Sequence, residues 1–106
     1  MKQTDFARTL ARYLTDFLPG QRNVSTNTIK SYRDTFKQYL MFMQNEQHIR
    51  TEKITFACIT VQSIKDFLRW LEISKNACIS TRNQRLAAVH SFFRYAQTEN
   101  PEILFE

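Results

Sequence analysis

Apolar residues recur at every third or fourth position along four stretches of the chain, which is the spacing that places them on one face of an α-helix. The first stretch runs from Thr4 to Leu18 and is ended by Pro19 and Gly20. The second runs from Thr26 to about Glu46 and follows Ser25, a residue type that caps helix N-termini. The second half of this helix is also apolar at Met41 and Phe42, so it is expected to be buried all round. The residues expected on the buried faces are Phe6, Leu10, Tyr13, Leu14 and Phe17 in the first helix and Ile29, Tyr32, Phe36, Tyr39, Leu40 and Met43 in the second.

Two further helices are predicted in the second half of the chain. Thr60 is expected to cap the third, which ends near Asn76, and Ser80 is expected to cap the fourth, which stops before Pro101. Residues 48–59 are expected to be a connector, in which residues 53–56 could be briefly extended. The expected buried stripes are Val61, Ile64, Phe67, Leu68, Trp70 and Leu71 in the third helix and Leu86, Val89, Phe93 and Ala96 in the fourth, whose opposite face would carry Gln84, Ala87, Ala88 and Ser91.

The composition favours one all-α domain. The chain has 106 residues, of which 42% are hydrophobic, so it is long enough to bury a core. One glycine and two prolines provide few turns, which argues against a many-stranded sheet. The predicted fold is therefore a compact bundle of four to five helices in residues 1–98. Residues 99–106 contain three acidic residues and no basic one, and we expect them to begin a linker.

The sequence contains no pattern that predicts catalysis, a metal or a cofactor. Cys58 and Cys78 are separated by nineteen residues and lack a C-x-x-C pair or a nearby histidine array, which favours two reduced thiols over a metal site or a disulfide. The two histidines and four tyrosines lack the spacing of a catalytic constellation, and no phosphate-binding or dinucleotide-binding loop is present. No apolar stretch approaches the ~20 residues that span a membrane, which favours a cytoplasmic protein.

Positive charge is concentrated in the second and fourth predicted helices. The net charge is +5; residues 80–98 carry three arginines and no acidic residue, and residues 22–43 carry four basic residues against Asp34 alone. Both helices begin with hydroxyl residues, and helix N-termini offer N–H groups to phosphates. We therefore expect the two helix starts to share one surface that contacts nucleic acid. The alternative is that the basic residues only solvate exposed helix faces.

Three stretches of the sequence resemble a known family. STRNQRLAAVHSFFRYA, residues 80–96, closely resembles the last main helix of the N-terminal core-binding domain of tyrosine recombinases, the phage-integrase and Xer-type family. The family pattern is roughly Ser/Thr, then Asn-x-Arg-Leu-x-Ala-aliphatic, then Phe-Phe-x-Tyr/Trp. VSTNTIKSYRDTFKQYLMFM, residues 24–43, is similar to the family's Ser-x-x-Thr-aliphatic-x-x-Tyr-x-x-x-aromatic helix, and ITVQSIKDFLRWL, residues 59–71, resembles the segment before the last helix. The three matches agree in order and spacing and together span most of the chain.

This resemblance implies a SAM-like fold, often two crossed helical hairpins, that forms one jaw of a clamp around double-stranded DNA. It implies that a separate C-terminal domain, to which nothing in this chain corresponds, carries the nucleophilic tyrosine. Other protomers of a synaptic complex would be partners of the full-length protein, and the isolated domain is expected to be monomeric.

The resemblance also implies which residues contact DNA, because the starts of the second and fourth helices would enter the major groove. Lys30, Arg82 and Arg85 would contact phosphates, although the family commonly has an aliphatic residue in place of Arg82. Carried over by motif position, the DNA-binding residues are Thr28, Lys30 and Ser31 in the second helix and Ser80, Thr81, Arg82, Gln84 and Arg85 in the fourth.

Two other classes of function remain open at this point. A helical protein-interaction module would use its basic face to bind an acidic partner and would not bind DNA even at low ionic strength. A stand-alone helix-turn-helix regulator would need a short turn between two helices and usually a dimer. The long connector between the second and third helices disfavours the regulator, whereas residues 74–79 are short enough to be such a turn.

Overall fold

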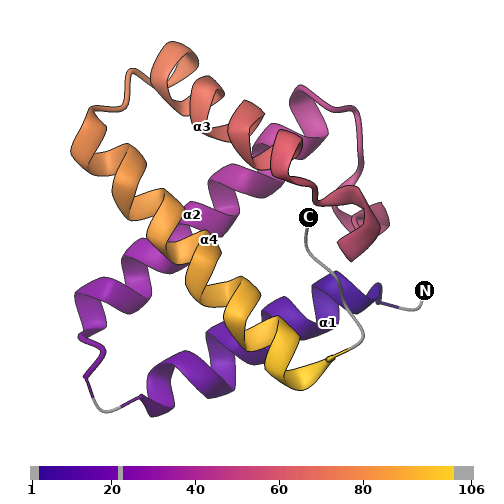
Figure 1. Ribbon diagram of the computed structural model, residues 1–106, viewed down its shortest axis with the longest axis vertical. Helices are drawn as coiled ribbons and strands as arrows, with labels where there is room; N and C mark the ends of the chain where they lie inside the picture. The colour runs from indigo at the N-terminus through magenta and orange to yellow at the C-terminus, as the bar shows by residue number, and fades with distance from the viewer. Residues whose placement is uncertain (1–2, 22, 102–106) are drawn as a thin grey trace. The chain divides into compact units, whose positions relative to one another are not determined.

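The computed structural model describes residues 3–21 and 23–101, which form four α-helices and four short helical turns and contain no strand. The α-helices are α1 (Asp5–Arg12), α2 (Thr26–Asn45), α3 (Val61–Ser74) and α4 (Ile79–Glu99). The prediction of an all-α fold is thus confirmed. The chain divides into two compact units, Met1–Phe56 with α1 and α2 and Ala57–Glu106 with α3 and α4, so each unit holds two consecutive helices (Figure 1).

The first helical stretch is less regular than its sequence pattern predicts. Thr4 caps α1, because its Oγ1 accepts a hydrogen bond from the Ala7 N–H at 3.1 Å. Beyond Arg12 the chain continues as a π-helical turn, Tyr13–Phe17, and a 3-10 turn, Leu18–Gly20. The wider π turn changes which positions face inward. Leu18 is therefore buried, whereas Leu14 and Phe17, which were predicted to be in the core, are only half-buried.

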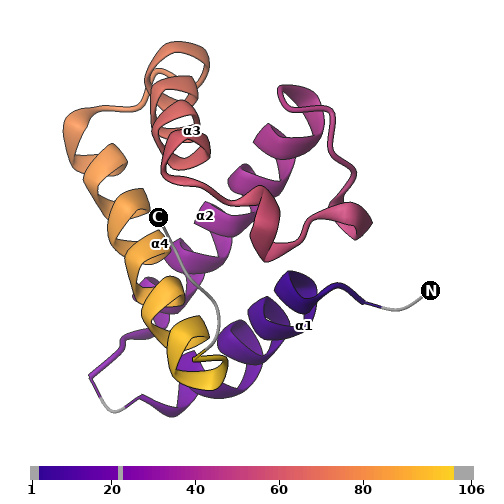
Figure 2. The same ribbon diagram turned by 45° about the vertical axis from the view of Figure 1, so that its right-hand side comes forward.

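Aromatic side chains form much of the core of the first unit. Phe6 packs edge-on against Phe56 with ring centroids 5.8 Å apart, and Tyr13 packs edge-on against Phe36 at 6.3 Å. These contacts join α1 and the π turn to α2 and to the end of the connector. The Phe56 N–H also donates a hydrogen bond to Asp5 Oδ1 at 3.2 Å, which fixes the connector against the start of α1. Figures 1 and 2 show α2 turning back from the end of the first helical stretch.

α2 follows its predicted bounds closely but is not buried all round in its second half. Phe42 is buried, whereas Met41 has 45% of its surface exposed, so this part of the prediction is wrong. One turn separates Met41 from the exposed Lys37, and the two side chains share the solvent side of the helix. The buried residues of α2 are Thr35, Phe36, Tyr39, Phe42 and Met43, and the predicted core residues Ile29, Tyr32 and Leu40 are half-buried.

The connector contains 3-10 turns at Thr51–Lys53 and Phe56–Cys58 instead of an extended segment over residues 53–56. Ile54, which is fully buried, has an extended backbone between the two turns. The second unit then begins with α3, for which the predicted cap is confirmed: the Ser63 N–H donates to Thr60 Oγ1 and the Thr60 N–H donates to Ser63 Oγ, both at 3.0 Å. The reciprocal bonds form a capping box.

α3 ends as the sequence predicts, but α4 does not start as predicted. Asn76 has a left-handed backbone with a φ of 55°, and the Ala77 N–H bonds back to the Leu71 carbonyl at 3.0 Å, which closes the end of α3. The N-cap of α4 is Cys78 and not Ser80, which lies within the first turn. Glu99 is the last residue of α4, and residues 102–106 of the expected linker lie outside the described residues.

The buried face of α4 also differs from the predicted stripe. Ala88 was expected on the exposed face but is fully buried, whereas Leu86 and Phe93 were expected in the core and are half-buried. Phe92, Phe93 and Tyr95 project in different directions around the helix, so the apolar pattern does not select a single face. The buried residues are Ala88, Val89, Phe92, Tyr95 and Ala96.

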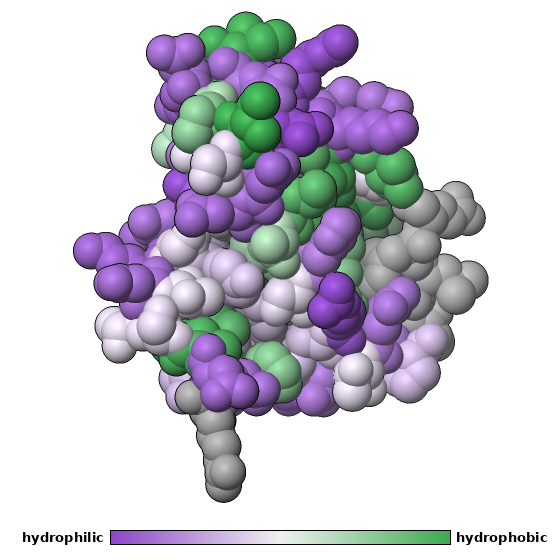
Figure 3. Space-filling view, turned by 60° about the vertical axis from the view of Figure 1, so that its left-hand side comes forward, coloured by the Kyte–Doolittle hydropathy of each residue, from purple (hydrophilic) through white to green (hydrophobic). Residues whose placement is uncertain are grey.

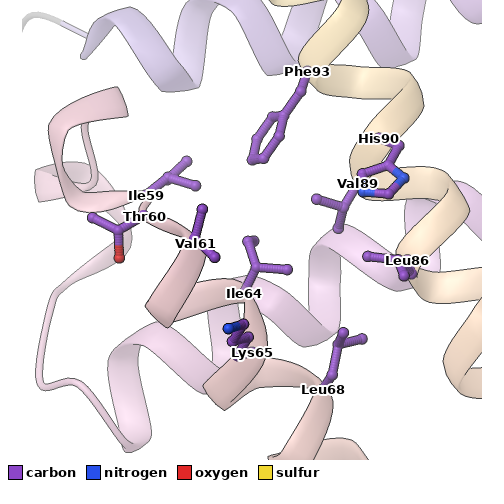
Figure 4. Close-up of a pocket in the computed structure, with 10 residues that line it drawn as sticks. All are labelled: Ile59, Thr60, Val61, Ile64, Lys65, Leu68, Leu86, Val89, His90 and Phe93. Carbon is purple, nitrogen blue, oxygen red and sulfur yellow. The ribbon is translucent and has the colours of Figure 1, made fainter. Parts of the chain in front are cut away.

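α3 and α4 leave an apolar pocket of about 310 Å³ between them. In Figure 4, Phe93 of α4 points toward it from one side and Val61 and Ile64 of α3 from the other. The pocket explains why Ile64 and Phe93 are only half-buried and why Val61 is 49% exposed. Apart from Thr60, Lys65 and His90, the residues around it are apolar.

Candidate nucleic-acid interface

The start of α2 is held by hydroxyl groups. The Thr28 N–H donates a hydrogen bond to Ser25 Oγ at 3.1 Å, and the Ser25 and Thr28 hydroxyls lie 3.0 Å apart. The predicted N-cap is therefore confirmed, and the half-buried Thr28 hydroxyl takes part in it. Ser31 is also half-buried, and its carbonyl accepts a hydrogen bond from Thr35 Oγ1 at 3.0 Å. Two of the three predicted α2 site residues thus lie toward the packed side of the helix.

Three basic residues form a row along the exposed side of α2, which we call the cationic ridge: Lys30, Arg33 and Lys37. Residues three and four apart lie on the same helix face, so the ridge runs along about two turns. All three side chains are exposed, and none forms an ion pair with another described residue. Phe36 and Tyr39 occupy the opposite, buried side. Arg33 and Lys37 were not among the predicted site residues, although their charge and spacing could have identified them.

The predicted site residues at the start of α4 differ in exposure. Ser80 and Gln84 are exposed, whereas Thr81, Arg82 and Arg85 are half-buried. The Nε atom of Arg85 is shielded from solvent. Arg82 and Arg85 are thus less available to a phosphate than the charge count of the sequence suggests.

Arg82 makes an ion pair that the sequence does not reveal. Its Nε lies 2.7 Å from Oε1 of Glu72, so the side chain links the start of α4 to the end of α3. The nine residues between the partners include the turn from α3 to α4, and no helical spacing connects them. The pair is partly exposed and contributes little to stability, ~0–1 kcal/mol, but it neutralises the arginine nearest the start of the helix.

Cys78 has an unusual environment at the start of α4. Its Sγ lies 3.4 Å from the Thr81 Oγ1, and it accepts no bond that would cap the helix in the usual way. The Thr81 hydroxyl, followed by the Thr81 and Ser80 backbone groups, lowers the pKa of the Cys78 thiol below its ordinary value. Cys78 and Cys58 form no disulfide. The exposed Cys78 is thus a favoured site for modification by thiol reagents.

The accessible side of the first two turns of α4 is neutral, in contrast to the cationic ridge. We call the exposed residues Ser80, Asn83, Gln84 and Ala87 the neutral strip, because they follow the i, i+3, i+4, i+7 spacing of one helix face and carry no charge. Ile79, the first residue of α4, adjoins this strip with 76% of its surface exposed. In the space-filling view of Figure 3, small hydrophobic groups lie within a largely hydrophilic face. Asn83 and Ile79 were not among the predicted site residues.

No helix in the described residues is long and apolar enough to cross a membrane. Over residues 3–21 and 23–101, no group of three or more histidine, cysteine or acidic residues is placed to hold a metal ion. The two helix starts, α2 with its cationic ridge and α4 with its neutral strip, are therefore the sites considered further. Their placement on one shared surface stays a prediction.

Comparisons with known proteins support the resemblance inferred from the three sequence motifs. The model of the family "Phage integrase, N-terminal SAM-like domain" matches residues 10–100. Two proteins of Sinorhizobium fredii (strain NBRC 101917 / NGR234) are similar: "Putative integrase/recombinase y4rC" is 40% identical over 95% of this chain, and "Putative integrase/recombinase y4rD" is 33% identical over 87%. The matches cover 30% and 33% of those proteins, so the chain spans about a third of their length. No solved structure is significantly similar.

Proposed function

We propose a function for this chain, which belongs to the family of phage integrase N-terminal SAM-like domains. The chain is the part of a site-specific recombinase that grips double-stranded DNA. In this proposal, strand cleavage and exchange are performed by a separate C-terminal domain of a longer protein. The relatives named as integrase/recombinase, of which this chain spans about a third, support this division. The full-length protein would bind other protomers in a recombination complex.

The cationic ridge is the observation that carries the proposal. Lys30, Arg33 and Lys37 are exposed and make no ion pair with the described residues, so their charges are available to phosphates. Each basic residue that neutralises a phosphate releases counterions, and this release supplies much of the affinity of DNA-binding proteins. Ser25 and Thr28 fix the helix start beside the ridge. The ridge would follow the DNA backbone while side chains at the start of α4 reach the bases.

A salt titration with a matched control tests the proposal. The variant K30A/R33A/K37A removes three ridge charges, and R8A/R12A/K53A removes the same number from exposed positions outside the ridge. Binding to a duplex of about 20 base pairs is measured by fluorescence anisotropy at several salt concentrations. If all three residues contact phosphates, the slope of log K against log salt falls by about 2.7 in the ridge variant, because each contact contributes about 0.9.

The control variant should keep most of the wild-type slope. Equal losses in both variants would mean that only net charge matters, and they would reject the ridge as the DNA-binding surface. An absence of DNA binding by the wild-type chain at low salt, combined with binding to an acidic protein, would favour the protein-interaction module instead.

A further inference from the structure

The neutral strip of α4 has the chemistry of a surface that reads bases. Ser80, Asn83, Gln84 and Ala87 are exposed and uncharged, while Arg82 is paired with Glu72 and Arg85 is half-buried. A helix face without free charge adds little to the sequence-independent attraction of phosphates. Short amide, hydroxyl and methyl groups, by contrast, fit the edges of base pairs in the major groove. If α4 enters the groove, its accessible side is therefore suited to specificity more than to affinity.

We propose that Asn83 reads an adenine in the major groove, with Ile79 against the methyl group of a neighbouring thymine. This inference rests on the proposed DNA-binding function and assigns a chemical preference to it. An asparagine amide can accept from adenine N6 and donate to adenine N7 at the same time. Apolar side chains discriminate thymine through its methyl group. Together the two residues select an A·T-containing step.

The position of Asn83 on α4 supports this role. Asn83 lies one turn after Ile79 and one turn before Ala87, so its amide stands between two exposed apolar groups. Its side chain makes no hydrogen bond or ion pair within the described part of the chain, so its donors and acceptor are available. Gln84 carries the same amide chemistry, but it adjoins the fully buried Ala88 at the edge of the strip and has one more rotatable bond to immobilise.

The exposure of Ile79 is a second, independent observation. Ile79 has 76% of its surface exposed, so this apolar surface is available for contact with an apolar group of a ligand. Ile79 follows the N-cap directly, where a groove-binding helix presents its first side chains to bases. Covering Ile79 with a thymine methyl removes apolar surface from water without requiring any charged group.

The experiment uses duplexes that the wild-type 106-residue chain selects from a random-sequence pool. In the selected duplex, each adenine is replaced in turn by 7-deazaadenine, which lacks the N7 acceptor, and each thymine by uracil, which lacks the methyl group. One 7-deazaadenine position should weaken wild-type binding roughly five- to a hundredfold, the range of a good bidentate contact. N83A should bind the normal duplex at least as weakly as the wild type binds this analogue, because N83A loses both hydrogen bonds and the analogue only the one to N7, and N83A should be insensitive to the analogue. I79A should lose sensitivity to one uracil position in the same way.

Q84A is the matched control, because it removes the neighbouring amide and should retain the 7-deazaadenine effect. Sensitivity that disappears in Q84A but persists in N83A would overturn the assignment. The assignment would also be overturned if the selected duplexes shared no adenine, or if neither 7-deazaadenine nor uracil at any position changed the affinity. These outcomes leave the proposed function standing as long as K30A/R33A/K37A still lowers the salt slope. Failure of the wild-type chain to bind any duplex at low salt would reject both.

Discussion

The starts of α2 and α4 share a composition but differ in structure. Both carry hydroxyl residues and basic residues with few acids nearby. At α2, a serine side chain caps the helix and three basic residues stand exposed in a row. At α4, a cysteine occupies the cap position, one arginine is paired with Glu72 and another is half-buried. The sequence thus gives the number of basic residues in each helix. Packing against the neighbouring helix determines which of these basic residues can contact a phosphate.

From this difference we expect the two helices to contact different parts of the DNA. In the proposed complex, the cationic ridge of α2 would supply the salt-dependent attraction to phosphates. The neutral strip of α4 would supply contacts that differ between base pairs. Two of the following predictions test these separate roles, and the third, with the smallest expected effect, compares the two helix caps.

Saturating DNA should protect Cys78 from alkylation, because Cys78 lies at the start of α4 beside the neutral strip. With 90% of the chain bound, the rate of Cys78 modification by iodoacetamide should fall about tenfold, in proportion to the unbound fraction. Mass spectrometry of the modified peptides gives the rate. Cys58, which is half-buried in the connector, serves as the internal control and should be affected less. A Cys78 that stays equally reactive while DNA binds would exclude the start of α4 from the interface.

Removing the ion-pair partner of Arg82 should let the start of α4 contact a phosphate, as the cationic ridge of α2 is proposed to do. In E72Q the arginine loses its carboxylate partner, so it becomes available to a phosphate. The expected result is a salt slope steeper by about 0.9 and an affinity about fivefold higher at low salt, measured by anisotropy. E52Q removes the same charge from the looser Arg50–Glu52 pair, whose atoms are 3.9 Å apart. An identical gain in E52Q would show that general electrostatics, and not Arg82, causes the change.

Single substitutions at the N-caps of α2 and α4 should change the free energy of unfolding in opposite directions. S25A removes the acceptor of the Thr28 N–H and should lower the free energy of unfolding by about 1 kcal/mol. C78S introduces a better capping oxygen at the start of α4 and should raise it by about 0.5 kcal/mol. Urea unfolding followed by circular dichroism measures both values. Destabilisation by C78S would mean that the contact between Cys78 and Thr81 already caps α4 effectively.

The success of the sequence predictions follows the strength of local signals. Ser25 and Thr60 cap their helices with side-chain hydrogen bonds, and the starts of α2 and α3 were predicted correctly. At the start of α4 no side chain accepts a capping hydrogen bond, and the sequence predicts the N-cap at Ser80, two residues after the actual N-cap, Cys78. The π turn after Arg12 has no signature in the apolar spacing, which continues through it, and therefore the packing of Leu14 and Phe17 was misjudged.

The sequence predicts where the candidate site lies, and that location stays a prediction, but it does not predict which of the site's side chains are exposed. Charge and motif both pointed to the starts of α2 and α4, and Lys30, Ser80 and Gln84 are exposed there. The exposure of the other residues depends on tertiary packing. Arg82 is redirected by Glu72, a partner across a turn, and helical spacing gives no warning of this contact. Arg33 and Lys37 could have been identified from their charge and spacing, whereas Asn83 became a candidate only when the buried face of α4 was known.

Trp70, the chain's one tryptophan, is half-buried in α3, with its ring stacked on Phe67 and Lys75 Nζ 5.3 Å from the ring centroid. Its fluorescence is consequently an intrinsic optical reporter of the second unit alone, since the first unit has no indole. Ellipticity, by contrast, averages over the helices of both. Superimposable melting curves from these two signals would identify a single cooperative transition, whereas a displaced emission midpoint would reveal that the halves of this small protein lose their structure one after the other.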